Sequence, residues 1–168
     1  MIFPTPYPVL YLDYDGPLHN DEVYRTPKRG IYIKPGFTLF EHCGILEEAL
    51  QPYPQVKIVL STSWVRVLGF DRAKSYLPPC LQQRVVGATF HSQMDKQLFL
   101  AQSRGYQILS DVCRRKPLEW KWLALDNDDE GWPVGAEDKL ILCSDELGIS
   151  QASVQESMRV KFAATYAQ

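Results

Sequence analysis

Three short polar clusters contain residue types that could carry out chemistry, and each directly follows an apolar run. They are Asp13-Tyr14-Asp15-Gly16 after residues 9–12, Ser61-Thr62-Ser63 after residues 56–60, and Asp126-Asn127-Asp128-Asp129 after residues 122–125. A short apolar run bounded by polar residues is consistent with a buried strand. We therefore expect each cluster at the carboxyl end of a strand.

Three of these residues, Asp13, Asp15 and Asp126, would repel one another if the fold brought them together. Two carboxylates about 4 Å apart repel by roughly 4 kcal/mol at an effective dielectric of 20, so the cluster needs a proton, a basic side chain or a metal. An oxygen-only ligand set favours Mg²⁺, which joins one or two carboxylates to phosphate oxygens. The pattern predicts phosphoryl transfer, with one carboxylate free to attack phosphorus and form an aspartyl-phosphate.

The hydroxyl groups of the second cluster fit the same chemistry. A Thr or Ser at this strand end could donate to a phosphoryl oxygen, and a nearby cation would complete the charge stabilisation. Ser61 to Ser63 could instead cap a helix, a role that is compatible with phosphate binding. An Asp-x-Asp-Gly string is also a common surface turn, and residues 126–130 could form a solvated acidic loop. The shared position of the three clusters after apolar runs favours the site.

The elements that must position these clusters alternate along the chain. The patterns predict strands at 9–12, 56–60, 84–87, 122–125 and 139–143, with a further short one at 31–33. They predict helices at 37–50, 93–102 and 104–113, one containing Val65, Leu68 and Phe70, and a C-terminal helix capped by Ser150. This order predicts an α/β fold whose mostly parallel central sheet has helices on both faces. Ligands bind beyond the carboxyl ends of such strands, where neighbouring strands would gather the clusters.

Length and composition fit one globular domain. The 168 residues are 45% hydrophobic with a net charge of −2, which argues against disorder and against a broad nucleic-acid footprint. The sequence contains neither a secretory signal nor an apolar stretch that could span a membrane, so we expect a cytoplasmic protein without membrane contact. The four cysteines are at least 30 residues apart and are expected to be reduced thiols without a disulfide partner.

The first two clusters resemble motifs of the haloacid dehalogenase (HAD) superfamily of phosphatases. VLYLDYDG resembles the first motif of this superfamily, which implies that Asp13 is the nucleophile and Asp15 the general acid and base. VKIVLST resembles the second, which implies that Thr62 binds the phosphoryl group, with Ser61 as the alternative register. Ser63, the next residue, is expected to bind phosphate as well.

The third and fourth motifs of this superfamily lie further along the chain. The third is a basic residue on a helix before the fourth strand, usually Lys. Arg104, which opens RGYQIL, fits by position, and Lys116 is the second candidate. WLALDND resembles the fourth motif, with Asp126 as metal ligand and Asn127 where many members have a second Asp. The resemblance implies that Mg²⁺ is held by Asp13, the backbone carbonyl of Asp15, and Asp126.

The resemblance covers roughly residues 8–145 and implies a three-layer Rossmann-like fold in one domain, 1–168. The spacing leaves room for a short flap at about 16–36 but not for a separate cap domain. Capless members often act on bulky phosphate esters. LDYDGPLH, LSTSW and LALDNDDEGW also resemble bacterial HAD domains associated with RNA-repair proteins, so the expected substrates include phosphorylated nucleic-acid ends.

Four further residues flank the clusters, and two other functions remain open. His19 could touch substrate, but a surface position on the flap is favoured for it; Arg66 could face the site, but a surface or structural role is favoured. Trp64 and Trp132 could stack a base, but packing is favoured for both. One alternative function is a phospho-accepting receiver domain of the signalling type. The other is a catalytically silent HAD-like binding module, an alternative suggested by Asn127.

Overall fold

The computed structural model describes residues 5–168, and its centre is a five-stranded sheet in the order β5-β4-β1-β6-β7. Every pairing is parallel, so the carboxyl ends of the strands meet at one edge. The predicted α/β fold is confirmed. The strands are β1 (Val9–Leu12), β4 (Lys57–Leu60), β5 (Val85–Ala88), β6 (Trp122–Asp126) and β7 (Leu140–Leu142).

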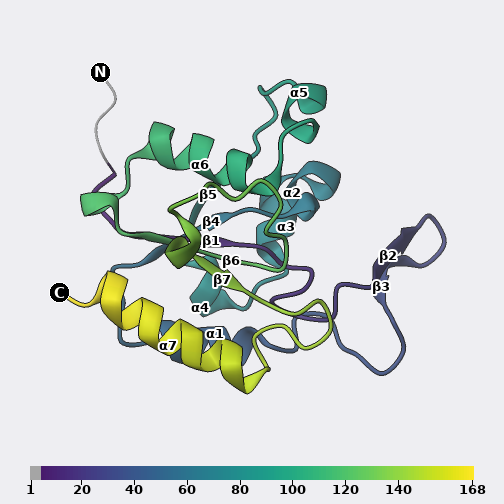
Figure 1. Ribbon diagram of the computed structural model, residues 1–168. Coiled ribbons are helices and arrows are strands. Elements are labelled where there is room, and N and C mark those ends of the chain that lie inside the picture. Colours follow the sequence, from purple (N-terminus) through teal and green to yellow (C-terminus); the bar gives the residue numbers. More distant parts are fainter. Residues whose placement is uncertain (1–4) are drawn as a thin grey trace.

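Successive residues of β1 face different helix layers, which Figure 1 shows above and below the sheet. Leu10 and Leu12 belong to the larger hydrophobic core, under α1 and α7, whereas Val9 and Tyr11 pack in a smaller core with α6. All four are fully buried, as expected for a central strand of a parallel sheet covered on both faces. The covering helices are α1 (Cys43–Leu50), α6 (Arg104–Arg115) and α7 (Ala152–Tyr166).

Several helices differ from their predicted bounds. The helix predicted from residue 37 begins only at Cys43, after Phe40 adopts a left-handed φ of 60° that a helix does not allow. The helix predicted through Phe70 is interrupted at Gly69, whose φ is 88°. Ser150 does not cap the last helix, because its hydroxyl donates to the Leu147 carbonyl and the helix starts at Ala152.

The remaining helices are short. Residues 93–102, predicted as one helix, contain only a five-residue helix, because Asp95 accepts hydrogen bonds from Gln97 N and Leu98 N and so begins it late. The short helices are α2 (Ser63–Leu68), α3 (Phe70–Ser75), α4 (Pro79–Gln82), α5 (Lys96–Leu100), η1 (Leu118–Trp120) and η2 (Glu137–Lys139).

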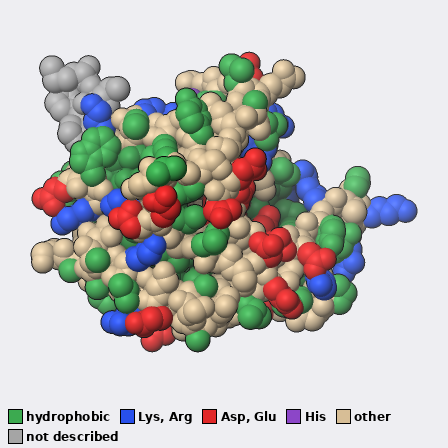
Figure 2. All heavy atoms as spheres, viewed as in Figure 1, with side chains coloured by type: hydrophobic (Ala, Val, Ile, Leu, Met, Phe, Trp, Pro, Cys, Tyr) green, Lys and Arg blue, Asp and Glu red, His purple; other side chains and the backbone are tan. Residues whose placement is uncertain are grey.

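A β-hairpin occupies the second half of segment 16–36. Strands β2 (Val23–Thr26) and β3 (Gly30–Ile33) pair antiparallel and project from the body of the molecule. Only the second of these strands was predicted. Lys28 and Arg29 lie exposed in the turn between them, and Figure 2 shows basic side chains at the projecting end of the hairpin.

Two further features of the described chain concern its helices and its cysteines. None of its helices is long and apolar enough to cross a membrane. All four cysteines lie in the described part and are free thiols, of which Cys43 and Cys143 are buried.

Candidate active site

The carboxyl edge of the sheet brings the three polar clusters together. In the sheet register Leu12 of β1 pairs with Leu60 of β4 on one side and with Leu125 of β6 on the other. One position further on, the chain reaches Asp13, Ser61 and Asp126 at the same height. The backbone N–H of Asp13 still donates to the Leu125 carbonyl at 3.1 Å, and that of Ser61 to the Leu12 carbonyl at 2.8 Å. Parallel pairing therefore fixes where Asp13 and Asp126 meet.

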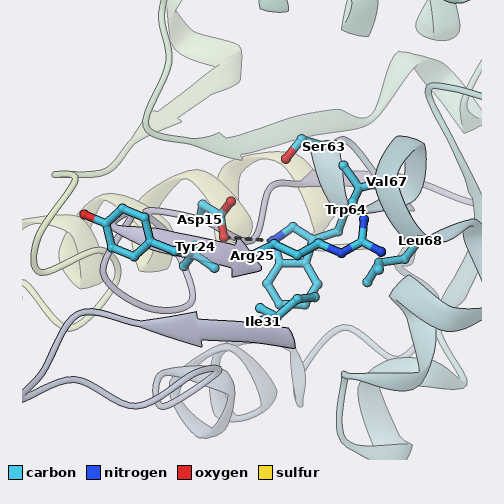
Figure 3. Close-up of a pocket in the computed structure, with 9 residues that line it drawn as sticks. Asp15, Tyr24, Arg25, Ile31, Ser63, Trp64, Val67 and Leu68 are labelled. Atoms are coloured by element: carbon cyan, nitrogen blue, oxygen red, sulfur yellow. Dashed lines mark hydrogen bonds between the residues drawn. The ribbon is translucent and has the colours of Figure 1, made fainter. Parts of the chain in front are cut away.

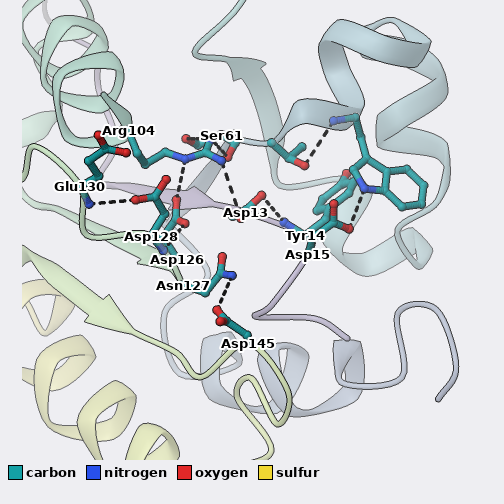
Figure 4. A network of polar contacts seen from close by, with 12 residues as sticks. Asp13, Tyr14, Asp15, Ser61, Arg104, Asp126, Asn127, Asp128, Glu130 and Asp145 are labelled. Atoms are coloured by element: carbon teal, nitrogen blue, oxygen red, sulfur yellow. Dashed lines mark hydrogen bonds and ion pairs between the residues drawn. The ribbon is translucent and has the colours of Figure 1, made fainter. Parts of the chain in front are cut away.

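Arg104 completes this cluster from the first turn of α6 (Figure 4). Its Nη1 donates to the Ser61 carbonyl at 2.7 Å, its Nε lies 3.3 Å from Asp126 Oδ2, and its Nη2 lies 3.9 Å from Asp13 Oδ2. The next residue, Gly105, allows close packing, because a Cβ there would lie 2.5 Å from the Gly131 carbonyl oxygen. The small glycine thus lets α6 begin close to the carboxylates.

The second candidate for the basic residue, Lys116, lies elsewhere. It is the C-cap of α6, and its carbonyl accepts a hydrogen bond from the backbone N–H of Thr5. A 12-residue helix is about 18 Å long, so Lys116 lies far from the end of α6 that carries Arg104. The structure brings Arg104, and not Lys116, to the carboxylates.

Burial dominates the electrostatics of the two carboxylates. It raises the pKa of Asp13 to about 6, although Arg104 and the hydrogen bonds from Tyr14 and Thr62 work in the opposite direction. Burial and the neighbouring Asp13 raise the pKa of Asp126 well above its ordinary value. Burial opposes the charge of Arg104, but Asp13 and Asp126 outweigh it and raise its pKa. Ionising both carboxyl groups together is therefore opposed, and a further bound cation would offset that cost.

The oxygen atoms of this cluster fit Mg²⁺. Asp13 Oδ1 accepts from Tyr14 N at 2.8 Å and Asp126 Oδ1 from Asp128 N at 3.0 Å, so in each carboxylate Oδ2 is the oxygen left over. Asp126 Oδ2 is buried without a hydrogen-bond partner in the described chain. Residues 5–168 contain no group of three His, Cys, Asp or Glu side chains arranged for a metal. Two carboxylates, a backbone carbonyl and waters are nevertheless a normal Mg²⁺ donor set.

The hydroxyl cluster after β4 divides its contacts between two parts of the site. Thr62 is the N-cap of α2, and its Oγ1 accepts from Trp64 N at 3.4 Å. The Thr62 hydroxyl also lies close enough to Asp13 to lower the pKa of that carboxyl. Ser61 instead supports Arg104 through its carbonyl, with its Oγ 3.4 Å from Nη1. Ser63 lines a hollow beside Asp15. Thr62 is therefore the hydroxyl next to the carboxylate predicted to attack.

Asp15 is held by two side chains whose role the sequence did not reveal. Its Oδ1 accepts from Trp64 Nε1 at 2.9 Å and lies 2.9 Å from His19 Nε2. The predicted surface position of His19 is wrong: its side chain is 0% exposed, because the turn after Gly16 folds it back against Asp15. Packing of Trp64, which was predicted, accounts for only part of its role, since its indole N–H also binds Asp15.

The side chain of Asn127 is directed to Asp145 and forms no hydrogen bond with Asp13 or Asp126. Its Nδ2 donates to Asp145 Oδ1 at 2.8 Å (Figure 4). Its side chain also packs against Gly16, where an added Cβ would lie 2.4 Å from Asn127 Cγ. Asp145, in the loop after β7, was not singled out from the sequence. Trp132 donates to the Ala136 carbonyl and lies beside Trp122, so it packs as predicted.

Arg66, on α2, is half-buried and lies near enough to Arg104 for the two charges to repel each other. Burial lowers its pKa, and so does the nearby Arg104. It forms no salt bridge with any described residue. It therefore adds positive charge beside the cluster without neutralising a carboxylate of its own.

One comparison with known proteins identifies a family for this chain. A family model described as "HAD domain in Swiss Army Knife RNA repair proteins" matches residues 9–154, which include all the residues of the cluster. No curated protein and no solved structure matches the chain.

Proposed function

The chain belongs to the family of HAD domains in Swiss Army Knife RNA repair proteins, and we propose that it is a magnesium-dependent phosphohydrolase acting through an aspartyl-phosphate on Asp13. The observation that carries this proposal is the convergence of Asp13 and Asp126 on Arg104, with Asp126 Oδ2 buried and without a hydrogen bond. Arg104 pairs electrostatically with that oxygen at 3.3 Å but forms no hydrogen bond to it, so the oxygen stays available to a metal.

In the proposed reaction each residue of the cluster has one task. One carboxylate oxygen of Asp13 attacks phosphorus in line, and Asp15 gives a proton to the ester oxygen as the P–O bond breaks. Asp15 then takes a proton from a water molecule, whose oxygen attacks the aspartyl-phosphate and releases Asp13 and inorganic phosphate. Arg104 and the Thr62 hydroxyl stabilise the negative charge on the phosphoryl oxygens throughout.

Mg²⁺ would be held by the side chains of Asp13 and Asp126 and by the backbone carbonyl of Asp15. When bound, it neutralises phosphoryl oxygens and offsets the repulsion between the two buried carboxylates. Arg104 already supplies part of that neutralisation through its contacts at 3.3 and 3.9 Å. The direct test of the proposal is Mg²⁺-dependent hydrolysis of para-nitrophenyl phosphate by the wild type, compared with Asp13→Asn. A rate unchanged by Asp13→Asn contradicts the proposal.

This test also separates the alternative functions. A silent binding module would bind phosphate without turnover, even with Mg²⁺ present. The family match gives no support to the receiver-type alternative, which would accumulate its aspartyl-phosphate rather than hydrolyse it. Release of more than one equivalent of phosphate per protein molecule therefore excludes both.

For the organic part of the substrate, we propose a phosphorylated nucleic-acid end. A hollow of about 140 Å³ opens beside Asp15, between the hairpin and α2, with apolar walls that include Val23, Ile31 and Leu68 (Figure 3). Ile31 and Leu68 also line the next hollow, of about 560 Å³, to which Arg25 and Arg72 contribute. The leaving group would occupy the first hollow and the following phosphate the second.

The two arginines of the second hollow favour a substrate with several phosphates over a substrate with one. Arg25 and Arg72 are exposed and form no salt bridge with any described residue. A mononucleotide or a phosphopeptide brings one phosphate, and that phosphate would bind at Asp13. An oligonucleotide brings a second anion for the arginines, and neutralising it would release counterions.

A chain-length series tests this choice of substrate. We expect kcat/KM to rise from a mononucleotide to a terminally phosphorylated trinucleotide. Arg72→Gln should lower by about one the slope of log kcat/KM against log salt concentration for the trinucleotide. Hydrolysis of para-nitrophenyl phosphate should stay unchanged in this variant, because Arg72 lines the second hollow and not the first. Equal kcat/KM across the series, or preference for a phosphopeptide, contradicts the nucleic-acid assignment while leaving the phosphohydrolase intact.

A further inference from the structure

His19 and Trp64 come from different parts of the sequence and meet on one oxygen atom. The turn of residues 14–19 returns His19 to Asp15: Gly16 N donates to the His19 carbonyl at 3.0 Å, and Leu18 N to the Tyr14 carbonyl at 3.0 Å. Trp64 arrives from the second residue of α2, after β4. Both ring nitrogens lie 2.9 Å from Asp15 Oδ1.

The hydrogen bonds around His19 determine where its proton lies. The backbone N–H of Phe40 donates to His19 Nδ1 at 3.0 Å, so Nδ1 carries no proton. The neutral imidazole therefore has its proton on Nε2 and donates it to Asp15. The contacts are rigid, because His19 is fully buried and the Phe40 ring lies edge-on against it with ring centroids 4.8 Å apart. Residues on both sides of the imidazole thus select one tautomer.

Two donors on Oδ1 leave Asp15 with one reactive oxygen. Oδ1 uses both of its in-plane lone-pair directions on Trp64 and His19, so a proton on this carboxyl group resides on Oδ2. Oδ2 has no hydrogen bond to any described residue, and the Asp15 side chain is 27% exposed. Figure 3 shows the second oxygen pointing away from Trp64, and Asp15 lines the hollow between α2 and the hairpin.

We propose that His19 and Trp64 are positioning residues that fix Asp15 by Oδ1, so that Oδ2 alone exchanges protons with the leaving group and with water. This inference rests on the proposed function. The proton on Oδ2 passes to the ester oxygen as the P–O bond breaks, and Oδ2 later accepts a proton from the attacking water. Without the two donors, the carboxyl group could rotate and present either oxygen at a poorer angle.

The test compares two leaving groups. para-Nitrophenolate leaves readily without a proton, whereas a sugar hydroxyl needs one. Loss of a well-placed acid should therefore strongly slow only hydrolysis of the sugar phosphate. Trp64→Phe keeps the aromatic ring but removes the N–H. We expect it to lower kcat on a nucleoside monophosphate at least about tenfold more than kcat on para-nitrophenyl phosphate, with KM little changed. Trp132→Phe is the matched control, since that indole binds Ala136 instead.

Histidine variants test the other donor. His19→Gln can keep an N–H toward Asp15 and an acceptor toward Phe40, and should retain activity on the nucleoside monophosphate; His19→Leu fills the space without either group and should lose it. In uniformly ¹⁵N-labelled wild type, the His19 Nδ1 resonance should be that of an unprotonated nitrogen. Provided that the wild type is active, equal losses of kcat on both substrates in Trp64→Phe, or a protonated His19 Nδ1, would overturn the inference. A wild type that hydrolyses neither substrate would instead refute the proposed function, and this inference with it.

Discussion

Arg104 Nε lies 3.3 Å from Asp126 Oδ2, yet that oxygen remains without a hydrogen bond. The guanidinium directs its better hydrogen bond, at 2.7 Å, to the Ser61 carbonyl. Arg104 is therefore anchored to β4 while its charge faces the carboxylates. A residue arranged in this way neutralises charge without closing the oxygen to a metal or to water.

This arrangement predicts different outcomes for two substitutions of Arg104. Arg104→Lys keeps the charge and should retain activity within about tenfold, whereas Arg104→Gln should lower kcat/KM by roughly a hundredfold or more. Without Mg²⁺, Arg104→Gln should also be less stable, by about 3 kcal/mol, because it leaves two buried carboxylates without their cation. Urea unfolding and initial rates measure the two effects. Equal activity of Arg104→Gln and the wild type would remove Arg104 from the site.

The raised pKa of Asp13 predicts how stability changes with pH. In the unfolded chain Asp13 ionises near 3.8, but in the folded protein it ionises near 6. Folding therefore favours the neutral carboxyl, and the stability that this group contributes is lost as the pH rises from about 4 to 6. Asp13→Asn removes that loss, so in EDTA it should be more stable than the wild type by up to about 3 kcal/mol at pH 7 and by little at pH 4.

Urea unfolding at several pH values measures this difference. Asp129→Asn provides the matched control, because that side chain is exposed and is not among the groups that shift the pKa of Asp13. A pH-independent difference between Asp13→Asn and the wild type would show that burial does not control the ionisation of Asp13.

Asp126 should control metal binding. Asp126→Asn removes the charge of the unpartnered oxygen and should reduce Mg²⁺ affinity at least about tenfold, so that the thermal stabilisation of the wild type by Mg²⁺ is largely lost. Thermal unfolding across a Mg²⁺ series gives this result without any substrate. Asp128→Asn is the control. If Mg²⁺ raised the Tm of Asp126→Asn by as much as it raises the Tm of the wild type, the metal would bind elsewhere.

The contact between Gly16 and Asn127 predicts a steric coupling. Gly16 has a φ of 99°, and a Cβ there would lie 2.4 Å from Asn127 Cγ. Gly16→Ala should therefore destabilise the protein by about 1–3 kcal/mol. Adding Asn127→Ala should recover part of this loss, because it removes the contact with Asn127 Cγ; the contact with Cβ of residue 127, at 2.8 Å, and the backbone strain remain. Strictly additive effects of the two substitutions in urea unfolding would show that the residues are not in contact.

The sequence predicted the strands and the meeting of the clusters because both depend on local patterns. Apolar runs ending in Asp13 and Asp126 predict strand ends, and parallel pairing then aligns them. The position of Arg104 followed from the chain order of the superfamily motifs, but its choice over Lys116 required the direction of α6, which places the two at opposite ends of one helix.

Other features depended on contacts that no local pattern contains. The helix predicted from residue 37 starts late because Phe40 takes a left-handed conformation in a segment that also donates to His19. The burial of His19 and its contact with Asp15 require the turn after Gly16, and the indole of Trp64 reaches the same oxygen only in the folded chain. The direction of Asn127 likewise depends on Asp145, 18 residues further on.

The central claim is that Asp13 carries the phosphoryl group. Its most direct test is mass spectrometry of protein quenched in acid during turnover of a phosphate ester with Mg²⁺. Peptide analysis should place one added phosphoryl group on Asp13 in the wild type, and Asp13→Asn should show none and should not turn over the ester. Turnover without this modification, or a phosphoryl group on another residue, would contradict the account.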